Sequence, residues 1–167
     1  MNEVVHEPRW YALRTKSRHE KLVRDQLEKQ GIEPLPTVRR LSQWKDRKKE
    51  IEVPLFSGYC FVRLSQQNRL PVQKVAGVVE VVGSGNRPEP IPDEEIEALK
   101  TLMTSVLPYD PHPYLHEGMM VEVVRGPLQG VHGILLRKEK RHRLVIGVRL
   151  IQQAVGVEIN VQDVVPA

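Results

Sequence analysis

The sequence predicts an α+β protein of two domains: a basic domain in which strands and helices alternate, then a small domain made of strands. Helical and strand periodicities alternate up to about residue 107 of the 167 residues. Residues 118–167 instead carry eleven valines, frequent glycine and no helical spacing. Three prolines between these regions are typical of a semi-rigid linker. We therefore expect a first domain over residues 1–107, a linker over 108–115 and a second domain over 116–167.

The first domain is expected to contain seven elements, in the order strand, helix, strand, strand, helix, strand, helix. This order is that of a split βαβ, or ferredoxin-like βαββαβ, arrangement followed by a further helix. The polar, basic residues 44–52 are expected to form an exposed loop or a protruding hairpin. The seven expected elements span residues 9–15, 17–31, 32–41, 56–64, 71–76, 78–82 and 92–106.

Local signals set the ends of these elements. Ser17 with Glu20 three residues later has the spacing of a capping box, so the first helix is expected to begin there. Gly31 is a usual residue just after a helix. Pro34 and Pro36 favour an edge position in the sheet for the extended segment 32–41, because proline has no N–H to donate to a neighbouring strand.

The second domain is expected to be a small five-stranded β-barrel. Short valine-rich runs recur with turn residues between them, and five strands in about fifty residues favour a barrel over an open sheet. The expected strands span residues 120–125, 131–138, 143–150, 155–159 and a last short piece near 164.

Alternation in the strand 56–64 divides its side chains between two faces of the first sheet. Gly58, Cys60, Val62 and Leu64 suit the face that packs on helices, and Phe56 belongs there unless the bend at Gly58 turns it. The opposite face then collects aromatic residues with arginines at their rim: Trp10, Tyr59, Phe61, Arg14 and Arg63. Either loops or the second domain cover these rings, or they form an exposed patch that marks a partner site.

Basic residues are clustered in the first domain rather than spread evenly. Lys and Arg exceed Asp and Glu by 25 to 21 over the chain. Such clusters either bind a polyanion or simply solvate a surface, and their placement alone does not decide between these. The two clusters are Arg14, Lys16, Arg18, Lys21 and Arg24, and Arg39, Arg40, Lys45, Arg47, Lys48 and Lys49.

Catalytic, metal and cofactor sites are not expected. Cys60 lies in an apolar run and is expected to be a buried small hydrophobe. His112 and His116 are separated by Pro113, which argues against a helical metal pair. The acids of residues 93–97 suit a solvated helix start. No apolar run has the length of a membrane span, and the polar N-terminus lacks a signal sequence, so a cytoplasmic location is expected.

A glycine pattern in the second domain resembles a KOW motif, which is found in NusG-type elongation factors and some ribosomal proteins. Its residues are Gly118, Val121, Gly126, Pro127, Gly130 and Gly133. Gly126-Pro127 makes a turn, while Gly130 and Gly133 allow a positive φ or a close approach of strands.

The first domain resembles the NusG N-terminal (NGN) domain. Trp10-Tyr11 near the start and the string from Pro54 to Val62 carry this resemblance, although Ser57 stands where the family usually has proline. Residues 16–21 and 43–49 are similar to those of specialised paralogues of the UpxY and RfaH kind, which are operon-specific antiterminators that often serve polysaccharide gene clusters.

This resemblance implies a monomeric factor without a cofactor that binds the largest subunits of RNA polymerase near the clamp helices. The implied polymerase-binding residues are Trp10, Arg14, Phe56, Tyr59 and Phe61. The non-template DNA strand would contact Lys16, Arg18, His19, Arg24, Arg39, Arg40 and Lys45.

The KOW domain would recruit a small-subunit ribosomal protein or the termination factor Rho. The alternative reading is a KOW-containing RNA-binding or ribosome-associated protein.

Overall fold

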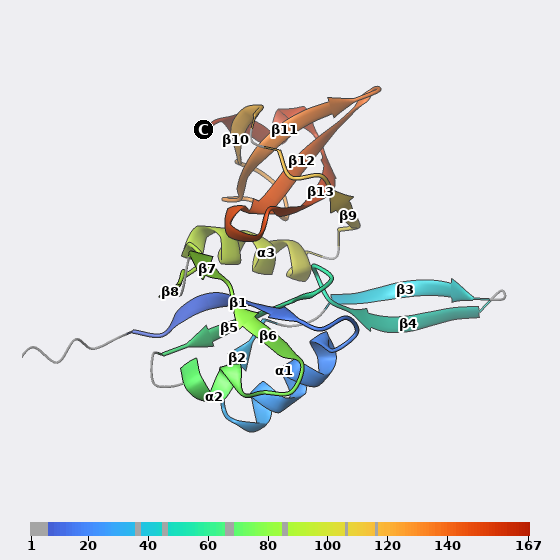
Figure 1. Ribbon diagram of the computed structural model, residues 1–167. Helices are drawn as coiled ribbons and strands as arrows, with labels where there is room; N and C mark the ends of the chain where they lie inside the picture. Colours follow the sequence, from blue (N-terminus) through green and yellow to red (C-terminus); the bar gives the residue numbers. More distant parts are fainter. Residues whose placement is uncertain are drawn as a thin grey trace, which may run out of the picture. The chain divides into compact units, whose positions relative to one another are not determined.

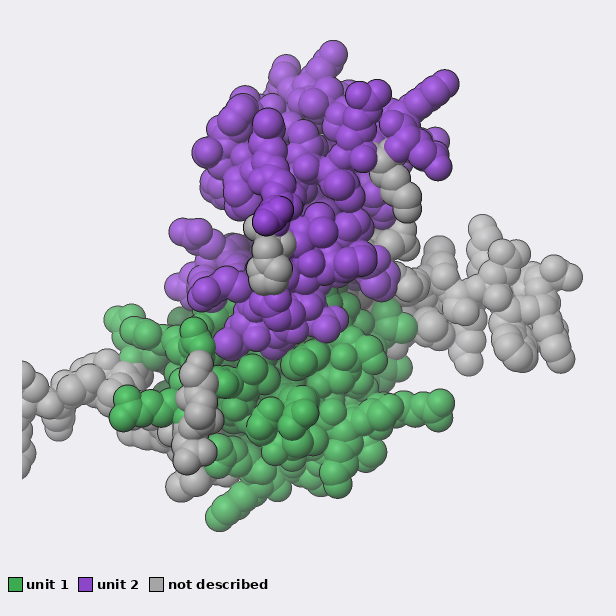
Figure 2. Space-filling model, turned by 45° about the horizontal axis from the view of Figure 1, so that its top comes forward, with its two compact units in different colours: residues 1–91 green, residues 92–167 purple. Residues whose placement is uncertain are grey.

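A computed structural model describes residues 7–35, 38–44, 47–65, 69–84, 87–105, 107–115 and 117–167. The chain divides into two compact units, residues 1–91 and 92–167 (Figure 2). The boundary expected from the sequence lay after residue 107, so the third helix falls in the second unit instead. Helix α3 (Asp93–Thr104) contacts strand β12 (Arg141–Val148), and this packing places it there.

The first unit contains a four-stranded antiparallel sheet with the strand order β2-β5-β1-β6. Helix α1 joins β1 to the edge strand β2, and β5 lies between those two strands, so the expected ferredoxin-like arrangement is confirmed (Figure 1). The elements are β1 (Arg9–Thr15), α1 (Glu20–Lys29), β2 (Glu33–Pro34), β5 (Tyr59–Leu64), α2 (Arg69–Gln73) and β6 (Val78–Val81).

One face of this sheet packs against both short helices. Leu13 on β1 and Val62 on β5 lie in one buried cluster with Val23 and Leu27 of α1 and Val72 of α2. Cys60 and Leu64 belong to the same cluster, as the alternation of β5 predicted. Burial of such side chains stabilises a fold by roughly 1.5–3 kcal/mol each. The apolar face of α1 therefore holds the sheet in register.

The polar segment near residue 48 forms a hairpin, which is one of the two alternatives that the sequence left open. Strands β3 (Val38–Trp44) and β4 (Arg47–Val53) pair along their whole length as a separate two-stranded sheet. The hairpin begins earlier than predicted, because regular pairing continues through residues 38–43. A second, very short hairpin consists of β7 (Gly83–Ser84) and β8 (Arg87–Pro88).

Helix α1 begins three residues later than the capping-box pattern predicted. His19 occupies the N-cap without a side-chain hydrogen bond, and Arg18 adopts a left-handed φ of 63°. Glu20 is therefore the first helical residue, and its carboxylate points to Gly58 rather than back to the helix start. The capping-box interpretation is wrong because a tertiary partner takes the carboxylate.

The second unit contains helix α3 and a six-stranded antiparallel sheet with the order β14-β10-β11-β12-β13-β9. The five strands expected for the barrel all form, with bounds shifted by a few residues. They are β10 (Met119–Val123), β11 (His132–Lys138), β12, β13 (Gln153–Ile159) and β14 (Val164–Pro166). Two 3-10 turns, η2 (Arg149–Ile151) and η3 (Val161–Asp163), connect the last of them. None of the described helices has the length and apolar character that crossing a bilayer requires.

The sixth strand comes from the segment that the sequence predicted to be a linker. Residues Tyr109–His112 form β9, which pairs antiparallel with β13. Pro111 is tolerated because β9 is an edge strand, where a missing N–H faces no partner. The proline-rich linker is therefore at least partly a component of the barrel sheet.

The motif glycines occupy positions that a larger residue fits poorly. Gly126 and Gly130 lie in the turn before β11 and have φ values of 89° and 90°. Gly133 lies within β11, where a Cβ atom would stand 2.6 Å from the carbonyl oxygen of Val145. Val121 is buried in the barrel core, and Gly118 also has a positive φ. Both roles that the sequence offered for these glycines, positive φ and close strand approach, therefore occur.

Replacing Gly133 by alanine should destabilise the barrel, because backbone atoms of β12 cannot move aside as a flexible side chain can. We expect a loss of roughly 1–3 kcal/mol for such overpacking. The matched control is Gly156→Ala in β13, where the added Cβ would meet only side-chain atoms at 3.2 Å or beyond. Thermal unfolding followed by circular dichroism measures both, and equal midpoints for the two variants would contradict the close-approach argument.

Candidate functional site: a sheet face with a basic turn

The strand register brings the residues predicted for polymerase binding onto one face of the first sheet. In the antiparallel pair of β1 and β5, Trp10 is opposite Arg63, Ala12 is opposite Phe61 and Arg14 is opposite Tyr59. Directly opposite residues of an antiparallel pair project from the same face. The shared face that alternation predicted for these side chains is therefore present.

The centre of this face is not the exposed aromatic patch that the sequence left as one alternative. Trp10, Phe56 and Phe61 are only 5%, 4% and 3% exposed. The rings of Phe56 and Phe61 meet edge to face, with centroids 5.9 Å apart. Burying such rings stabilises the fold far more than leaving them in water would. The rings are therefore covered and do not form an exposed patch.

Phe56 joins this face because the chain turns at Gly58. Strict alternation would place Phe56 with the helix-facing residues, but residues 57–58 form a turn and Gly58 has a φ of 86°. The left-handed conformation breaks the alternation before β5 begins. The ring of Phe56 therefore packs on Phe61 rather than on α1.

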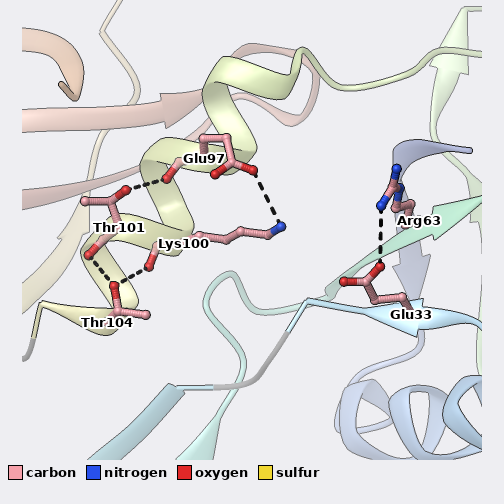
Figure 3. A network of polar contacts seen from close by, with 6 residues as sticks. All are labelled: Glu33, Arg63, Glu97, Lys100, Thr101 and Thr104. Carbon is pink, nitrogen blue, oxygen red and sulfur yellow. Dashed lines mark hydrogen bonds and ion pairs between the residues drawn. The ribbon is translucent and has the colours of Figure 1, made fainter.

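The accessible part of the face is its rim. Tyr59 is half-buried, and the side chains of Arg14 and Arg63 are each about half exposed. Arg14 forms an ion pair with Glu80 at 3.1 Å, and Arg63 forms one with Glu33 at 3.9 Å (Figure 3). Exposed ion pairs of this kind contribute about 0–1 kcal/mol. Both guanidinium groups can therefore exchange these partners for another anion at small cost.

A basic turn is attached to this rim through Gly58. The carbonyl oxygen of Gly58 accepts a hydrogen bond from the Thr15 amide at 2.9 Å, and its own N–H donates to the Glu20 carboxylate at 2.8 Å. Lys16 and Arg18 are exposed in the turn between Thr15 and Glu20. The Lys16 amide also donates to the carbonyl of Gly77, so both ends of the turn are fixed to the sheet.

The other residues predicted to contact DNA are placed less favourably or lie outside the described region. Arg24 has a side chain only 16% exposed and an ion pair with Asp25 at 3.0 Å. His19 is half-buried, with Nδ1 2.8 Å from the carbonyl oxygen of Ser17. The structure describes the backbone of β3 at Arg39 and Arg40 but not their side chains, and Lys45 lies outside the described residues. Lys16 and Arg18 are thus the cations of this set that present an open surface.

Cys60 is buried, as predicted, and burial raises the pKa of its thiol to about 12. The nearby Arg24 lowers this pKa and Glu20 raises it, but both effects are smaller than that of burial. Because the thiolate is the nucleophile, such a thiol is inert near neutral pH. Among the described residues, no group of three or more His, Cys, Asp or Glu side chains could hold a metal ion.

A cleft of about 710 Å³ within the second unit was not predicted from the sequence. Helix α3 forms one wall and the barrel forms the other, with Ala98, Tyr114, Ile134 and Val145 among its lining residues. Its edge is fixed by Glu95, whose carboxylate accepts a hydrogen bond from the Arg149 amide at 3.2 Å. Burial raises the pKa of Glu95 above its usual value, and the Arg149 hydrogen bond opposes this.

The sequence predicts that Glu95 and its acidic neighbours lie at a solvated helix start, but the Glu95 carboxylate accepts a hydrogen bond from the barrel. Its partner is 54 residues away in the sequence, so no local pattern could have indicated the contact. By contrast, Glu97 of the same helix remains at the surface, where it forms an ion pair with Lys100 at 3.5 Å (Figure 3).

Comparisons with known proteins agree on one family. The family described as "Transcription termination factor nusG" matches residues 8–100. The "Transcription termination/antitermination protein NusG" of Helicobacter pylori strain J99 is 24% identical over 165 residues, covering 90% of this chain and 93% of the relative. The protein of strain 26695 has the same identity and coverage.

A solved structure has a similar fold over almost the whole chain. It is described as "Domain interaction in Thermotoga maritima NusG" and aligns with a TM-score of 0.56 at 23% identity, covering 95% of this chain and 96% of the other. The α+β first domain and the β-barrel of the second domain therefore occur together in a known protein.

Replacing Glu20 by alanine should loosen the turn that carries the basic residues. The change leaves the partly buried Gly58 N–H without an acceptor, which costs about 1–3 kcal/mol. Glu20→Gln retains an acceptor oxygen at this position and should cost less. Urea unfolding gives the stability loss, and hydrogen exchange of the Gly58 amide locates it. Unchanged exchange at Gly58 in the alanine variant would show that this hydrogen bond does not hold the turn.

Proposed function

The chain belongs to the NusG family of transcription termination factors, and we propose that it binds RNA polymerase during elongation and opposes pausing or termination. The single observation that carries this proposal is the continuity of two surfaces at Gly58. The end of the rim that carries Arg14 and Tyr59 adjoins the turn of Lys16 and Arg18 through two hydrogen bonds of Gly58. One protein surface can therefore contact a partner protein and a nucleic-acid strand together.

We assign polymerase binding to the rim rather than to the buried rings. Tyr59 and the two arginines are the accessible residues of the face, and tyrosine and arginine are enriched among residues that dominate binding energy. Trp10, Phe56 and Phe61 then form the rigid layer that supports Tyr59 and the two arginines. These three rings contact the partner directly only if the face opens. The partner would be the clamp helices of the largest polymerase subunits. Binding of this kind needs no chemical step, since a factor that prefers one state of polymerase shifts the population toward it.

We assign contact with the displaced non-template DNA strand to Lys16 and Arg18. Both are exposed cations on a turn that is fixed at both ends, so little backbone conformational entropy is lost when they engage phosphates. Single-stranded DNA is bound through such backbone contacts, with strong dependence on salt. Arg39, Arg40 and Lys45 in or beside the β3–β4 hairpin are the second candidates.

Operon-specific antitermination, in particular at gene clusters for polysaccharide synthesis, is the narrower form of the proposal. It is supported by the similarity of residues 16–21 and 43–49 to specialised members of the family. The barrel would then bind a small-subunit ribosomal protein or Rho. Action on one template but not on another of equal length would separate a specialised factor from a general one.

In vitro transcription across a pause site tests the polymerase assignment. The wild-type protein should shorten the pause, and a variant with Arg14→Glu and Tyr59→Ala should lose most of this effect because the rim no longer fits its partner. Arg9→Glu is the matched control, since Arg9 lies on the same strand but pairs with Leu64 on the opposite face of the sheet. Phe61 is avoided because truncating so buried a ring costs about 3–5 kcal/mol. Full activity of the double variant would refute the rim assignment.

Charge reversal at Lys16 and Arg18 tests the DNA assignment. The double variant with both changed to glutamate should crosslink poorly to non-template DNA in an elongation complex, because two phosphate contacts become repulsive. The control reverses two exposed lysines of the same unit, Lys29 and Lys74, and changes net charge equally. If both variants lose crosslinking to the same degree, the effect belongs to overall charge and the turn has no specific role.

A further inference from the structure

The hairpin that joins β11 to β12 carries a concentration of positive charge that the polymerase and DNA assignments do not use. Residues 137–143 contain five Lys or Arg and a single acid, Glu139. The rest of residues 117–167 contains two arginines and four acids. The charge of the barrel is therefore polarised toward one hairpin, whose tip ends the long β11–β12 ribbon in Figure 1.

The cations near the tip differ in how they are engaged. Arg137 and Lys140 are exposed, and neither forms an ion pair with another described residue. Arg141 is 75% exposed and forms an ion pair with Glu158 on β13 at 3.2 Å. Arg143 donates to the carbonyl of Gly156 and is held against the barrel. The open cationic surface is therefore formed by Arg137, Lys140 and Arg141, which we name the hairpin tip cations.

Outside this hairpin, the two described arginines of the barrel each lie near an acid. Arg125 lies 3.8 Å from Asp163 and also donates to the carbonyl of Gln162. The backbone amide of Arg149 donates to Glu95, and the charge of Arg149 lowers the pKa of that carboxyl. Stability alone does not account for the tip, because Glu139 has a left-handed φ of 58° at a position where glycine is usual.

We propose that the hairpin tip cations bind the phosphate backbone of a nucleic-acid strand. Guanidinium groups form two parallel hydrogen bonds to a phosphate, and an ammonium group adds a point charge. A narrow ribbon with cations at its end suits a linear polyanion. A nucleic-acid partner is consistent with the family of this chain, which is named for transcription. DNA and RNA are always close to a protein that acts in that process.

Two other anionic partners fit the tip less well. A membrane surface is usually held by apolar or aromatic side chains beside the basic ones, and residues 137–143 contain none. A folded acidic protein is usually held by buried aromatic anchors, with lysine depleted from the interface. The tip offers charge without an anchor, which is the chemistry of backbone phosphate binding.

The test is a nuclear magnetic resonance titration of the full-length ¹⁵N-labelled protein, because amide shifts locate the site. Short single-stranded RNA, single-stranded DNA of the same sequence and duplex DNA are the three probes, and they distinguish the source of the phosphates. Amides of residues 137–143 should shift with at least one of them, and affinity is read from these amides alone. Binding elsewhere, including at Lys16 and Arg18, therefore does not affect the measured affinity. The proposed function rests on other residues, so it can be refuted while binding at the hairpin is still observed.

The variant with Arg137→Gln and Lys140→Gln should bind at the hairpin roughly tenfold more weakly or worse at low salt, because it loses two phosphate contacts. The slope of log affinity against log salt should fall by about 1.4 for a single strand, since each contact contributes about 0.7. Arg125→Gln with Arg149→Gln is the matched control, which removes two exposed charges from the same unit. Its hairpin affinity should stay close to that of the wild type.

Three results would each overturn the proposal. The first is the absence of hairpin shifts with all three nucleic acids, and the second is an equal loss of affinity in the control variant. The third is a shift of the hairpin amides by phosphatidylserine vesicles or polyglutamate at lower concentration than by any nucleic acid.

Discussion

The hydrogen bond between the Glu20 carboxylate and the Gly58 amide is the constraint on which the candidate surface depends. It joins the first residue of α1 to the turn before β5, and the Thr15 amide holds the same glycine through its carbonyl. A buried carboxylate needs such a partner, because an unpaired one would be strongly disfavoured in an apolar environment. The Gly58 turn in turn decides where β5 begins and on which face Phe56 lies. The rim and the basic turn are therefore two sides of one small structural unit.

Strand β5 combines buried side chains that stabilise the fold with partly accessible side chains at its two ends. Its helix-facing side chains, Cys60, Val62 and Leu64, complete the core that α1 and α2 cover. On the other face, Phe61 is buried, while Tyr59 and Arg63 at its two ends remain partly accessible. A ring in the middle of the face can thus stiffen it without contacting a partner. The accessible side chains are at the ends of the strand, where Arg14 on β1 is opposite Tyr59, and the proposed function assigns recognition to them.

Charge is distributed differently in the two units, and this limits how each can bind a polyanion. Residues 1–91 contain 17 Lys or Arg against 11 Asp or Glu, whereas residues 92–167 contain 8 against 10. The first unit can attract nucleic acid through its overall field. The second has no such field, so attraction there must be local, and the hairpin tip is where its cations gather. Acids of α3 account for much of the opposing charge in that unit.

The sequence by itself determined most helices and strands of both domains and the division of β5 into two faces, because periodicity and alternation are local properties of the chain. It also located the motif glycines and the exposed Lys16 and Arg18. Only the tertiary structure decided the partner of Glu20, the face of Phe56, the burial of Trp10 and Phe61, and the pairing of Tyr109–His112 with β13. Each of these depends on which distant segment packs nearby. A sequence pattern shows that a side chain is apolar or charged, but the free energy that this side chain contributes to folding depends on the residues that it contacts.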